Sequence, residues 1–313
     1  MAQTHDPARI AVVGESLIDL VGGSDGRTYT AHPGGSPMNV AYGLGQLARP
    51  VTLLTRLGED PFGHILRDHL AAAGVELGLR PDDSFPTSMA LVALDAQGAA
   101  TYDFRIEWSL PTAAPLPDDA VAVHTGSIAA ALEPGATAVE ELLSGVRERG
   151  TATVTYDPNC RPALMGSRSA ALARVERLVA LSDVVKVSDE DLAWLYGDRK
   201  VEEVAEDWLG RGPALVVVTR GARGAYAVGH AAVVERPALA VDVVDTVGAG
   251  DAFMSGLLDS LAREDLLGAD RRAALASLPA GPLARIVDRA AHSAALTVGR
   301  AGALPPTAAE LDA

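Results

Sequence analysis

The chain has 313 residues, 48% of them hydrophobic, which is enough for a large buried core. Its formal net charge of −15 at pH 7 disfavours binding to nucleic acid and to anionic membranes. The single cysteine, Cys160, excludes an intrachain disulfide framework, and residues 1–10 lack the apolar stretch of a signal peptide. We therefore expect a cytoplasmic protein with neither nucleic acid nor a membrane as its partner.

Short apolar runs alternate with longer amphipathic stretches along most of the chain. In chain order we expect a strand at 9–13, a helix at 37–48, a strand at 51–56, a helix at 61–73, a strand at 120–124, a helix at 135–149, a strand at 151–157, a helix at 168–181, a strand at 184–187, a helix at 201–209 and a strand at 214–219. This alternation predicts an α/β fold whose mostly parallel central sheet is flanked by helices. Ligands of such sheets bind beyond the carboxyl ends of the strands.

Two segments, residues 17–31 and 86–110, interrupt this alternation and are typical of short strands joined by turns. Within the second segment, residues 89–94 and 101–106 are expected to form a hairpin around Gly98. We predict that the two segments form a small β-sheet lid beside the main sheet. No linker or repeat divides the sequence, so we expect one domain over the whole chain.

The predicted lid also suggests how the protein assembles. Alternation along the second lid strand puts four apolar side chains on one face: Tyr102, Phe104, Ile106 and Trp108. A sheet of this size is not stable alone, so one of its faces must pack against another surface. We expect a homodimer in which the lids of two copies pair.

The most informative stretch is residues 245–258, which begins Asp-Thr-Val-Gly-Ala-Gly-Asp and continues into an apolar helix pattern. A β run at residues 240–244 is expected to lead into it, and the helix is expected to start near Gly250. Almost no side chain is carried by Gly248, Ala249 and Gly250, so their backbone N–H groups can approach an anion at the helix N-terminus. This geometry suits a phosphate whose charge grows during transfer.

Asp251 lies in the first turn of this helix. A carboxylate is an unexpected neighbour for a phosphate unless it accepts a proton, and a hydroxyl that attacks the γ-phosphate of ATP needs such an acceptor. The alternative is a glycine-rich turn in which Asp251 only caps the helix. The full pattern of strand, glycine-rich loop and apolar helix favours the general base.

Residues 245–258 resemble the C-terminal signature of the ribokinase-like sugar kinases of the phosphofructokinase-B type. The resemblance extends over nearly the whole chain. It implies one α/β domain with a β-sheet lid, and in-line transfer of the γ-phosphate of Mg-ATP to a sugar hydroxyl. It also implies that Asp251 is the general base.

The sugar side of the site follows from the same resemblance. The run Gly34-Gly35-Ser-Pro-Met-Asn39 is similar to the N-terminal signature of the family. Its bare backbone admits sugar hydroxyls, and Asn39 can donate and accept hydrogen bonds toward them. Asp19 corresponds to a family carboxylate that takes two sugar hydroxyls. Arg105, on the lid, is a further candidate for substrate binding.

The family resemblance also implies a role for Arg161 and for a turn that contacts the nucleotide. Arg161, in the run Asp-Pro-Asn-Cys-Arg after a strand, is expected to reach the phosphate or sugar side of the cleft. The turn that carries Thr219, Gly221 and Gly224 resembles the family's nucleotide-contacting turn. His292 is expected near the adenine, together with the loop at residues 299–303.

The family also implies metal ions. Many relatives order magnesium waters with an Asn-x-x-Glu run, and this chain has Ser-Asp-Glu-Asp at residues 188–191 instead. Carboxylate character is kept, so Asp191 and Glu190 are the candidates to hold a hydrated Mg²⁺. Asp245 resembles part of a monovalent-cation site, which implies K⁺ as a further cofactor.

The detailed motifs are most similar to those of bacterial fructokinases, which implies conversion of D-fructose to fructose 6-phosphate. The rival substrate is 2-keto-3-deoxygluconate, whose carboxylate a pair of arginines, Arg105 and Arg161, could clamp. Asp19 would repel that carboxylate, and this favours fructose. The motifs are also compatible with ribose or a nucleoside as the substrate, and with a regulator on the same fold that binds sugar without catalysis.

Overall fold

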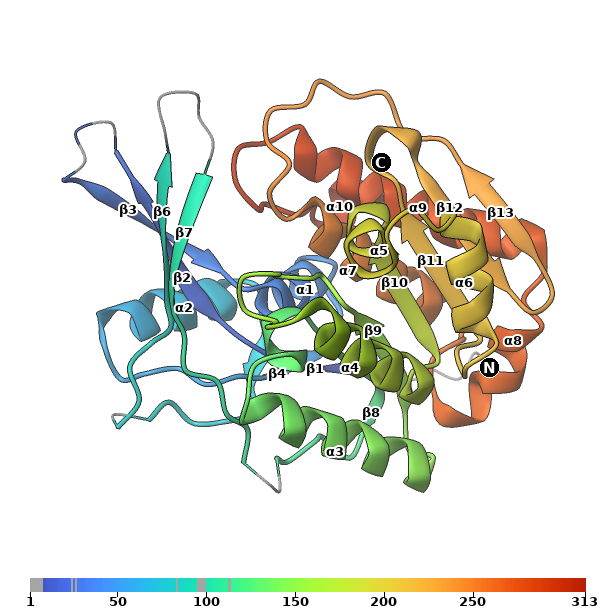
Figure 1. Cartoon of the computed structure of the whole chain (residues 1–313), viewed down its shortest axis with the longest axis horizontal. Helices are drawn as coiled ribbons and strands as arrows, with labels where there is room; N and C mark the ends of the chain where they lie inside the picture. The colour runs from blue at the N-terminus through green and yellow to red at the C-terminus, as the bar shows by residue number, and fades with distance from the viewer. Residues whose placement is uncertain (1–7, 24, 26, 83, 95–99, 112–113) are drawn as a thin grey trace.

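The computed structural model describes residues 8–23, 25, 27–82, 84–94, 100–111 and 114–313. These residues form a nine-stranded sheet and a separate four-stranded sheet, which stand side by side in Figure 1. The order of the large sheet is β13-β12-β11-β10-β9-β8-β1-β4-β5. Its strands are β1 (Arg9–Val13), β4 (Val51–Leu54), β5 (Glu76–Leu77), β8 (Ala120–Gly126), β9 (Thr153–Asp157), β10 (Val184–Ser188), β11 (Leu215–Thr219), β12 (Ala225–Gly229) and β13 (Val233–Arg236).

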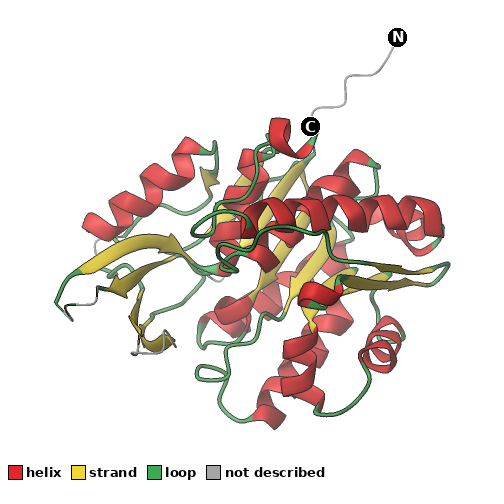
Figure 2. Ribbon diagram, turned by 90° about the horizontal axis from the view of Figure 1, so that it is seen from above, coloured by secondary structure: helices red, strands yellow, loops and turns green. Residues whose placement is uncertain are grey.

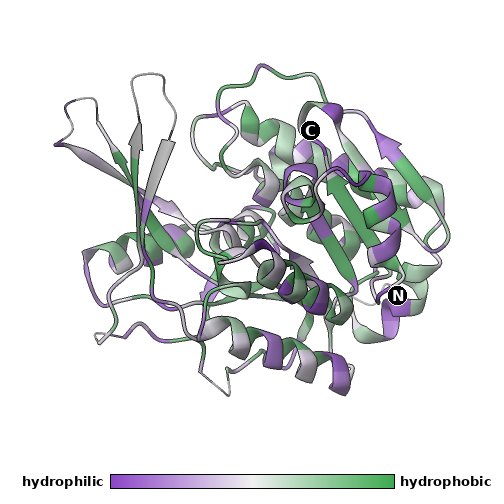
Figure 3. Ribbon diagram, viewed as in Figure 1, coloured by the Kyte–Doolittle hydropathy of each residue, from purple (hydrophilic) through white to green (hydrophobic). Residues whose placement is uncertain are grey.

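The large sheet is parallel from β5 to β11, and only β12 and β13 pair in the antiparallel direction. This confirms the predicted mostly parallel sheet. Parallel strands that are covered on both faces consist of nearly continuous apolar runs. The central strands are accordingly coloured as hydrophobic in Figure 3. The parallel direction also brings the carboxyl ends of β1, β8, β9, β10 and β11 to the same edge.

Helices cover both faces of the large sheet, as Figure 2 shows. They are α1 (Ser36–Gln46), α2 (Pro61–Ala72), α3 (Gly135–Arg149), α4 (Arg168–Leu181), α5 (Asp189–Tyr196), α6 (Val201–Leu209), α7 (Ala249–Arg263), α8 (Arg272–Ala276), α9 (Ala280–Val298) and α10 (Ala308–Leu311), with short 3₁₀ turns at Ser127–Ala130, Gly221–Arg223 and Ala269–Arg271. Within the described ranges, none of the helices combines the length and the apolar character needed to span a membrane.

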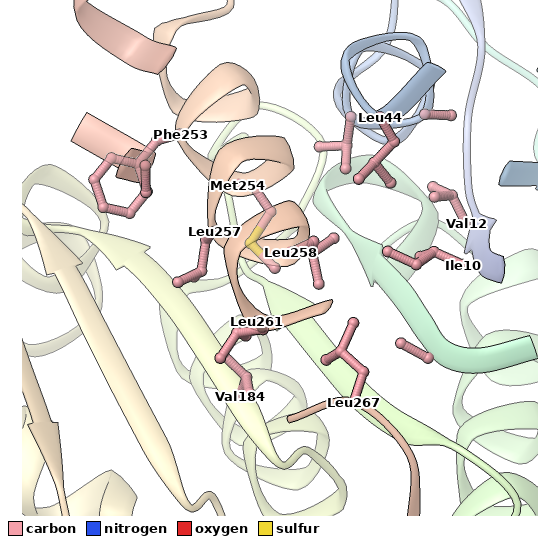
Figure 4. Packing of buried hydrophobic residues seen from close by; sticks show 14 of the residues in the cluster. Ile10, Val12, Leu44, Val184, Phe253, Met254, Leu257, Leu258, Leu261 and Leu267 are labelled. Carbon is pink, nitrogen blue, oxygen red and sulfur yellow. The ribbon is translucent and has the colours of Figure 1, made fainter. Parts of the chain in front are cut away.

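Alternation along β1 divides the core in two. Ile10 and Val12 pack with α1, α7 and α9. Ala11 and Val13 face the opposite side and pack with α3, α4 and α6. Figure 4 shows Leu44 of α1 and Leu258 of α7 near these two β1 side chains. Because successive side chains of a strand point to opposite faces, each strand contributes to both halves of the core. The α1 and α7 helices, which carry the two glycine signatures, therefore lie on the same face.

The small sheet has the order β3-β2-β6-β7. Its strands are β2 (Leu17–Gly22), β3 (Tyr29–Gly34), β6 (Met89–Leu94) and β7 (Ala100–Arg105). β2 and β6 are parallel, and the two outer pairs are antiparallel. A second sheet built from the two predicted segments is thus confirmed. The turn predicted at Gly98 lies outside the described residues.

The strand predicted at residues 240–244 is wrong. This segment is a loop, and Val243 and Val244 have 65% and 62% of their surface exposed. The backbone N–H of Val244 donates to the carbonyl of Val298 at 2.8 Å, so the segment meets the end of α9 and not a strand. The preceding residues already form β13, the edge strand, and the chain leaves the sheet after it.

The lid face predicted from alternation is only partly correct, because β7 ends at Arg105. Trp108 belongs to the main core: it is 3% exposed, and its indole N–H donates to the carbonyl of Ala129 at 3.0 Å. Phe104 and Ile106 are half-buried and pack with a small cluster at the base of the lid. The side chain of Tyr102 lies outside what the structure describes. The predicted lid face therefore loses its largest side chain.

Candidate active site

The glycine-rich loop ends in a left-handed residue that starts α7. Gly248 is the N-cap and has φ of 74°, a conformation that glycine adopts without strain. A Cβ atom at this position would lie 2.5 Å from the Cβ of Ala303, so the loop at residues 299–303 packs directly against the glycine. The N–H of Ala249 donates to the Thr246 carbonyl at 3.3 Å, and the next N–H groups of the first turn have no acceptor within the helix, as a phosphate site requires.

Asp251 lies in the first turn of α7 and is 7% exposed. Its Oδ1 accepts a hydrogen bond from the Ser36 hydroxyl at 2.6 Å, and its Oδ2 accepts one from the Asn39 amide at 2.9 Å. Both donors come from the first turn of α1, which packs against α7. The two glycine signatures therefore meet at one carboxylate. Asn39, which was predicted to contact the sugar, donates to Asp251 here.

The surroundings of Asp251 set its affinity for a proton. Burial raises its pKa above the ordinary aspartate value. The hydrogen bonds from Ser36 and Asn39 and the positive charges of Lys186 and Arg161 act in the opposite direction. A carboxylate with a raised pKa is a stronger base than an exposed aspartate, and this is the property that a proton acceptor needs.

A second carboxylate, Asp19, lies on β2 close to the glycine pair. Burial raises the pKa of Asp19 to about 6, while the charges of His32 and Arg161 act to lower it. A Cβ atom at Gly34 would collide with the Asp19 carboxylate, and one at Gly35 would lie 2.6 Å from the Glu15 carbonyl. The glycine pair is thus needed for close packing of the chain around Asp19.

Arg161 follows β9 and holds its own loop together. Its Nη1 donates to the side chain of Asn159 at 2.7 Å and to two backbone carbonyls. Burial raises the pKa of Glu15, Asp19 and Asp251, and the positive charge of Arg161 opposes that rise. The guanidinium is therefore close enough to act on the carboxylates near both glycine signatures.

Two residues of this region do not belong to the set predicted from the sequence. Ser36 directly follows the glycine pair, and a hydroxyl at a helix start was the only signal that it could donate a hydrogen bond. Lys186 lies on β10, and its Nζ is 2.7 Å from the Asp157 carboxylate at the end of β9. A lysine inside the apolar run Val-Val-Lys-Val was the available signal for this second residue.

The predicted nucleotide-contacting turn follows β11. Thr219 ends the strand, and Gly221 and Gly224 have φ of 52° and 87° around a 3₁₀ turn. A Cβ atom at Gly224 would collide with the carbonyl of Arg236, so this position requires glycine. His292 is half-buried on α9. It lies six residues before Val298, whose carbonyl accepts a hydrogen bond from Val244 in the loop ahead of α7.

The candidate cation residues have defined partners. The Asp245 carboxylate accepts from the N–H of Val247 at 3.0 Å and from that of Gly302 at 2.9 Å, and these bonds lower its pKa. Asp191 accepts from the N–H of Cys160 at 2.8 Å and forms a capping box with Ser188. Both carboxylates keep lone pairs for water or a cation.

Two further residues predicted to belong to the site, Glu190 and Arg105, are exposed to solvent. Glu190 is exposed in the first turn of α5. Arg105 has 69% of its side chain exposed and pairs with Asp103 of the same strand at 2.9 Å. Among the residues that the structure describes, no group of three histidine, cysteine, aspartate or glutamate side chains is placed to hold a metal ion.

The family model described as "pfkB family carbohydrate kinase" matches residues 7–309. A fructokinase of Rhizobium leguminosarum bv. trifolii is 38% identical over 271 residues, which are 82% of this chain and 81% of that protein.

Solved structures show the same likeness. The fructokinase of Xylella fastidiosa with bound ATP superposes with a TM-score of 0.87 at 29% identity, over 97% of this chain and 96% of that chain. A double mutant of the fructokinase of Vibrio cholerae O395, with fructose, ADP and potassium bound, gives a TM-score of 0.84 at 28% identity over 99% of each chain.

Proposed function

The chain belongs to the pfkB family of carbohydrate kinases, and within this family we propose that it is an ATP-dependent fructokinase that forms fructose 6-phosphate. The observation that carries the proposal is Asp251 at the N-terminus of α7. It is buried, it is held by two donors of α1, and it lies beside backbone N–H groups that suit a phosphate. A proton acceptor and an anion site are the two parts that phosphoryl transfer to a hydroxyl requires.

In the proposed reaction, Asp251 accepts the proton of the primary hydroxyl of the sugar. The hydroxyl oxygen forms a bond to the γ-phosphorus of ATP, the bond from that phosphorus to the β–γ bridging oxygen breaks, and ADP leaves. The backbone N–H groups of Gly248, Ala249 and Gly250 stabilise the charge on the transferred group. Arg161 adds a positive charge on the same side.

Fructose is the sugar that these residues favour. Asp19 lies against Gly34 and can accept hydrogen bonds from sugar hydroxyls, with Gly35 and Asn39 on the same turn. A carboxylate at this position would repel the carboxylate of 2-keto-3-deoxygluconate. Arg105, which would have to attract that group, is exposed and already paired with Asp103. The names of the similar proteins support the same choice.

ATP is proposed to bind between the β11 turn and α9, with Thr219, Gly221 and Gly224 at the phosphates and His292 toward the adenine. The apolar loop before α7, with exposed Val243 and Val244, would cover the base. The similar fructokinase of Xylella fastidiosa was solved with bound ATP, which supports ATP as the nucleotide.

Two cations are proposed with the nucleotide. Mg²⁺ would arrive on the ATP phosphates, with Glu190 and Asp191 accepting from its waters, and would supply charge neutralisation during transfer. K⁺ would lie near Asp245, whose carboxylate already joins the loop before α7 to Gly302. The similar fructokinase of Vibrio cholerae was solved with potassium, which supports K⁺ as the monovalent cation.

We also propose that the protein is a cytoplasmic homodimer that pairs through the lid, with residues 1–313 as one domain. Four strands alone bury little surface, and a second lid would cover the face that the main body leaves open. Light scattering at micromolar concentration tests this assembly. A single species with the mass of one 32.3 kDa chain would contradict it.

The proposed substrate is tested by kcat/KM with Mg-ATP for D-fructose, 2-keto-3-deoxygluconate and D-ribose. We expect fructose to have the highest value, and we expect Asp19→Ala to lower activity on it far more than Arg105→Ala. A clear preference for the keto acid would mean that Arg105 and Arg161 outweigh Asp19. No ATP consumption with any sugar would favour a regulator that binds sugar without catalysis.

A further inference from the structure

A buried lysine lies directly behind the glycine-rich loop. Val184 packs on the α7 side of the large sheet, and Lys186, two residues later, faces the same side because strand side chains alternate. In the parallel register of β9 and β10, Val185 lies opposite Tyr156, and Lys186 and Asp157 are the residues that follow these two. The two side chains pair at 2.7 Å and are only 4% and 1% exposed.

Stability alone does not explain such a pair. Removing two charges from water is costly, and apolar side chains of similar volume usually stabilise a core at least as well. Asp157 is the last residue of β9 and Lys186 lies two residues before the end of β10, so the pair is close to the edge of the sheet where ligands bind. The position of the Lys186–Asp157 pair therefore indicates a role in the proposed transfer site.

The ammonium of Lys186 is close to the residues that hold the phosphate. A Cβ atom at Gly250 would lie 3.0 Å from Lys186 Nζ, so only the hydrogen of a glycine separates the charge from the loop. Gly250 immediately precedes Asp251 in the first turn of α7. One lysine thus lies beside Asp157 on one side and beside the start of α7 on the other.

We propose that Lys186 is a positioning residue of the transfer site, whose buried ammonium, held by Asp157 and packed against Gly250, is the internal counter-charge that keeps Asp251 ionised. The inference rests on the proposed function, in which Asp251 must be ionised to accept a proton. It adds a residue that touches neither sugar nor nucleotide and acts through the general base.

The groups that act on Asp251 come from several elements. Ser36 and Asn39 donate from α1, Arg161 contributes its charge from the loop after β9, and Lys186 contributes its charge from β10. Burial raises the pKa of Asp251, and the charge of Lys186 is one of the contributions that oppose this rise.

Two acidic groups complete these surroundings. Asp157 interacts with Asp251 as a like charge, and Asp191 of α5 acts on Asp157 and on Lys186. Lys186 interacts with all three carboxylates, and its contact with Asp157 partly cancels its charge. Removal of the lysine charge should therefore raise the pKa of Asp251, and removal of the Asp157 charge should lower it.

The test is an NMR titration of Asp251 in the unliganded protein with ¹³C-labelled aspartate carboxyls, assigned by the signal that Asp251→Asn loses. In Lys186→Met we expect the midpoint to rise by about 1 pH unit, with a roughly tenfold lower kcat/KM on the acidic limb. In Asp157→Asn we expect the midpoint to fall. Lys200→Met is the matched control, because Lys200 is the only other lysine and its side chain is 78% exposed.

A double variant separates the proposal from a purely structural role, and it remains useful if the single lysine variant fails to fold. In Asp157→Asn/Lys186→Met neither charge is left unpaired, and we expect the Asp251 midpoint to stay above that of the original protein. A return to the original midpoint would overturn the proposal, because Lys186 would then serve Asp157 alone. An unchanged midpoint in a folded Lys186→Met protein would overturn it as well.

Failure of the proposed function has a different signature. If Asp251→Asn keeps its activity, or if fructose is not phosphorylated, the proposed reaction fails. The NMR midpoints do not depend on turnover, so they still test whether Lys186 controls the charge of Asp251.

Discussion

Asp251→Asn tests the chemistry most directly, because the replacement has nearly the same shape. In the original protein the carboxylate accepts from the Ser36 hydroxyl at 2.6 Å and from the Asn39 amide at 2.9 Å. The asparagine keeps one oxygen for one of these donors. Its NH₂ group can donate to the Ser36 hydroxyl, which can rotate to accept. The fold and the loop before α7 should therefore persist.

The loss should fall on the chemical step. An amide cannot take the hydroxyl proton, and a positioned general base contributes about 10²- to 10⁴-fold. At about 1.4 kcal/mol per tenfold, this corresponds to roughly 3–6 kcal/mol of transition-state stabilisation. We expect kcat to fall by about this factor while the Kd for ATP changes little, because the removed charge is the proton acceptor and not a nucleotide contact.

The assay couples ADP release to a spectroscopic reaction, and calorimetric titration gives the Kd for ATP. Ser36→Ala is the companion variant: it deletes one hydrogen bond that lowers the pKa of Asp251, so its loss should be small and concentrated at acidic pH. Turnover within a few-fold of the original in a folded Asp251→Asn protein would refute the assignment of the base.

Three further outcomes are expected. Gly34→Ala should raise KM for the sugar about tenfold or more, because its methyl group collides with the Asp19 carboxylate; an unchanged KM would mean that Asp19 does not bind the sugar. The pH profile of kcat/KM should lose activity as pH falls through a value above the ordinary aspartate pKa, since burial raises the pKa of Asp251 and the protonated acid cannot act as a base. Chelation of divalent cations should abolish phosphorylation and added Mg²⁺ should restore it; full activity under chelation would exclude the magnesium requirement.

Local sequence was sufficient for the framework. The alternation of apolar runs and amphipathic stretches predicted the parallel sheet, since strand and helix periodicities depend on near neighbours in the chain. The glycine-rich run ahead of Asp251 predicted the helix N-terminus that the structure has at Ala249. Both signals are contained within about fifteen residues, and the backbone geometry that they require is local.

Local pattern failed where a segment's partner decided its structure. Residues 240–244 are apolar enough for a strand, but the edge of the sheet is already occupied by β13 and the segment meets the end of α9. Trp108 alternates in register with the lid residues, but the strand ends at Arg105 and the indole enters the main core. The alternation of apolar side chains along a segment does not determine which surface that segment will pack against.

The fold class, the family and the position of the proposed base could all be predicted before any contact was known. The surroundings of that base could not be predicted. Ser36 and Asn39 are 215 and 212 positions from Asp251 in the chain, and Lys186 approaches Gly250 from β10. The proton affinity of a buried carboxylate depends on desolvation and on charges within a few ångströms, and these come from segments that only folding brings together.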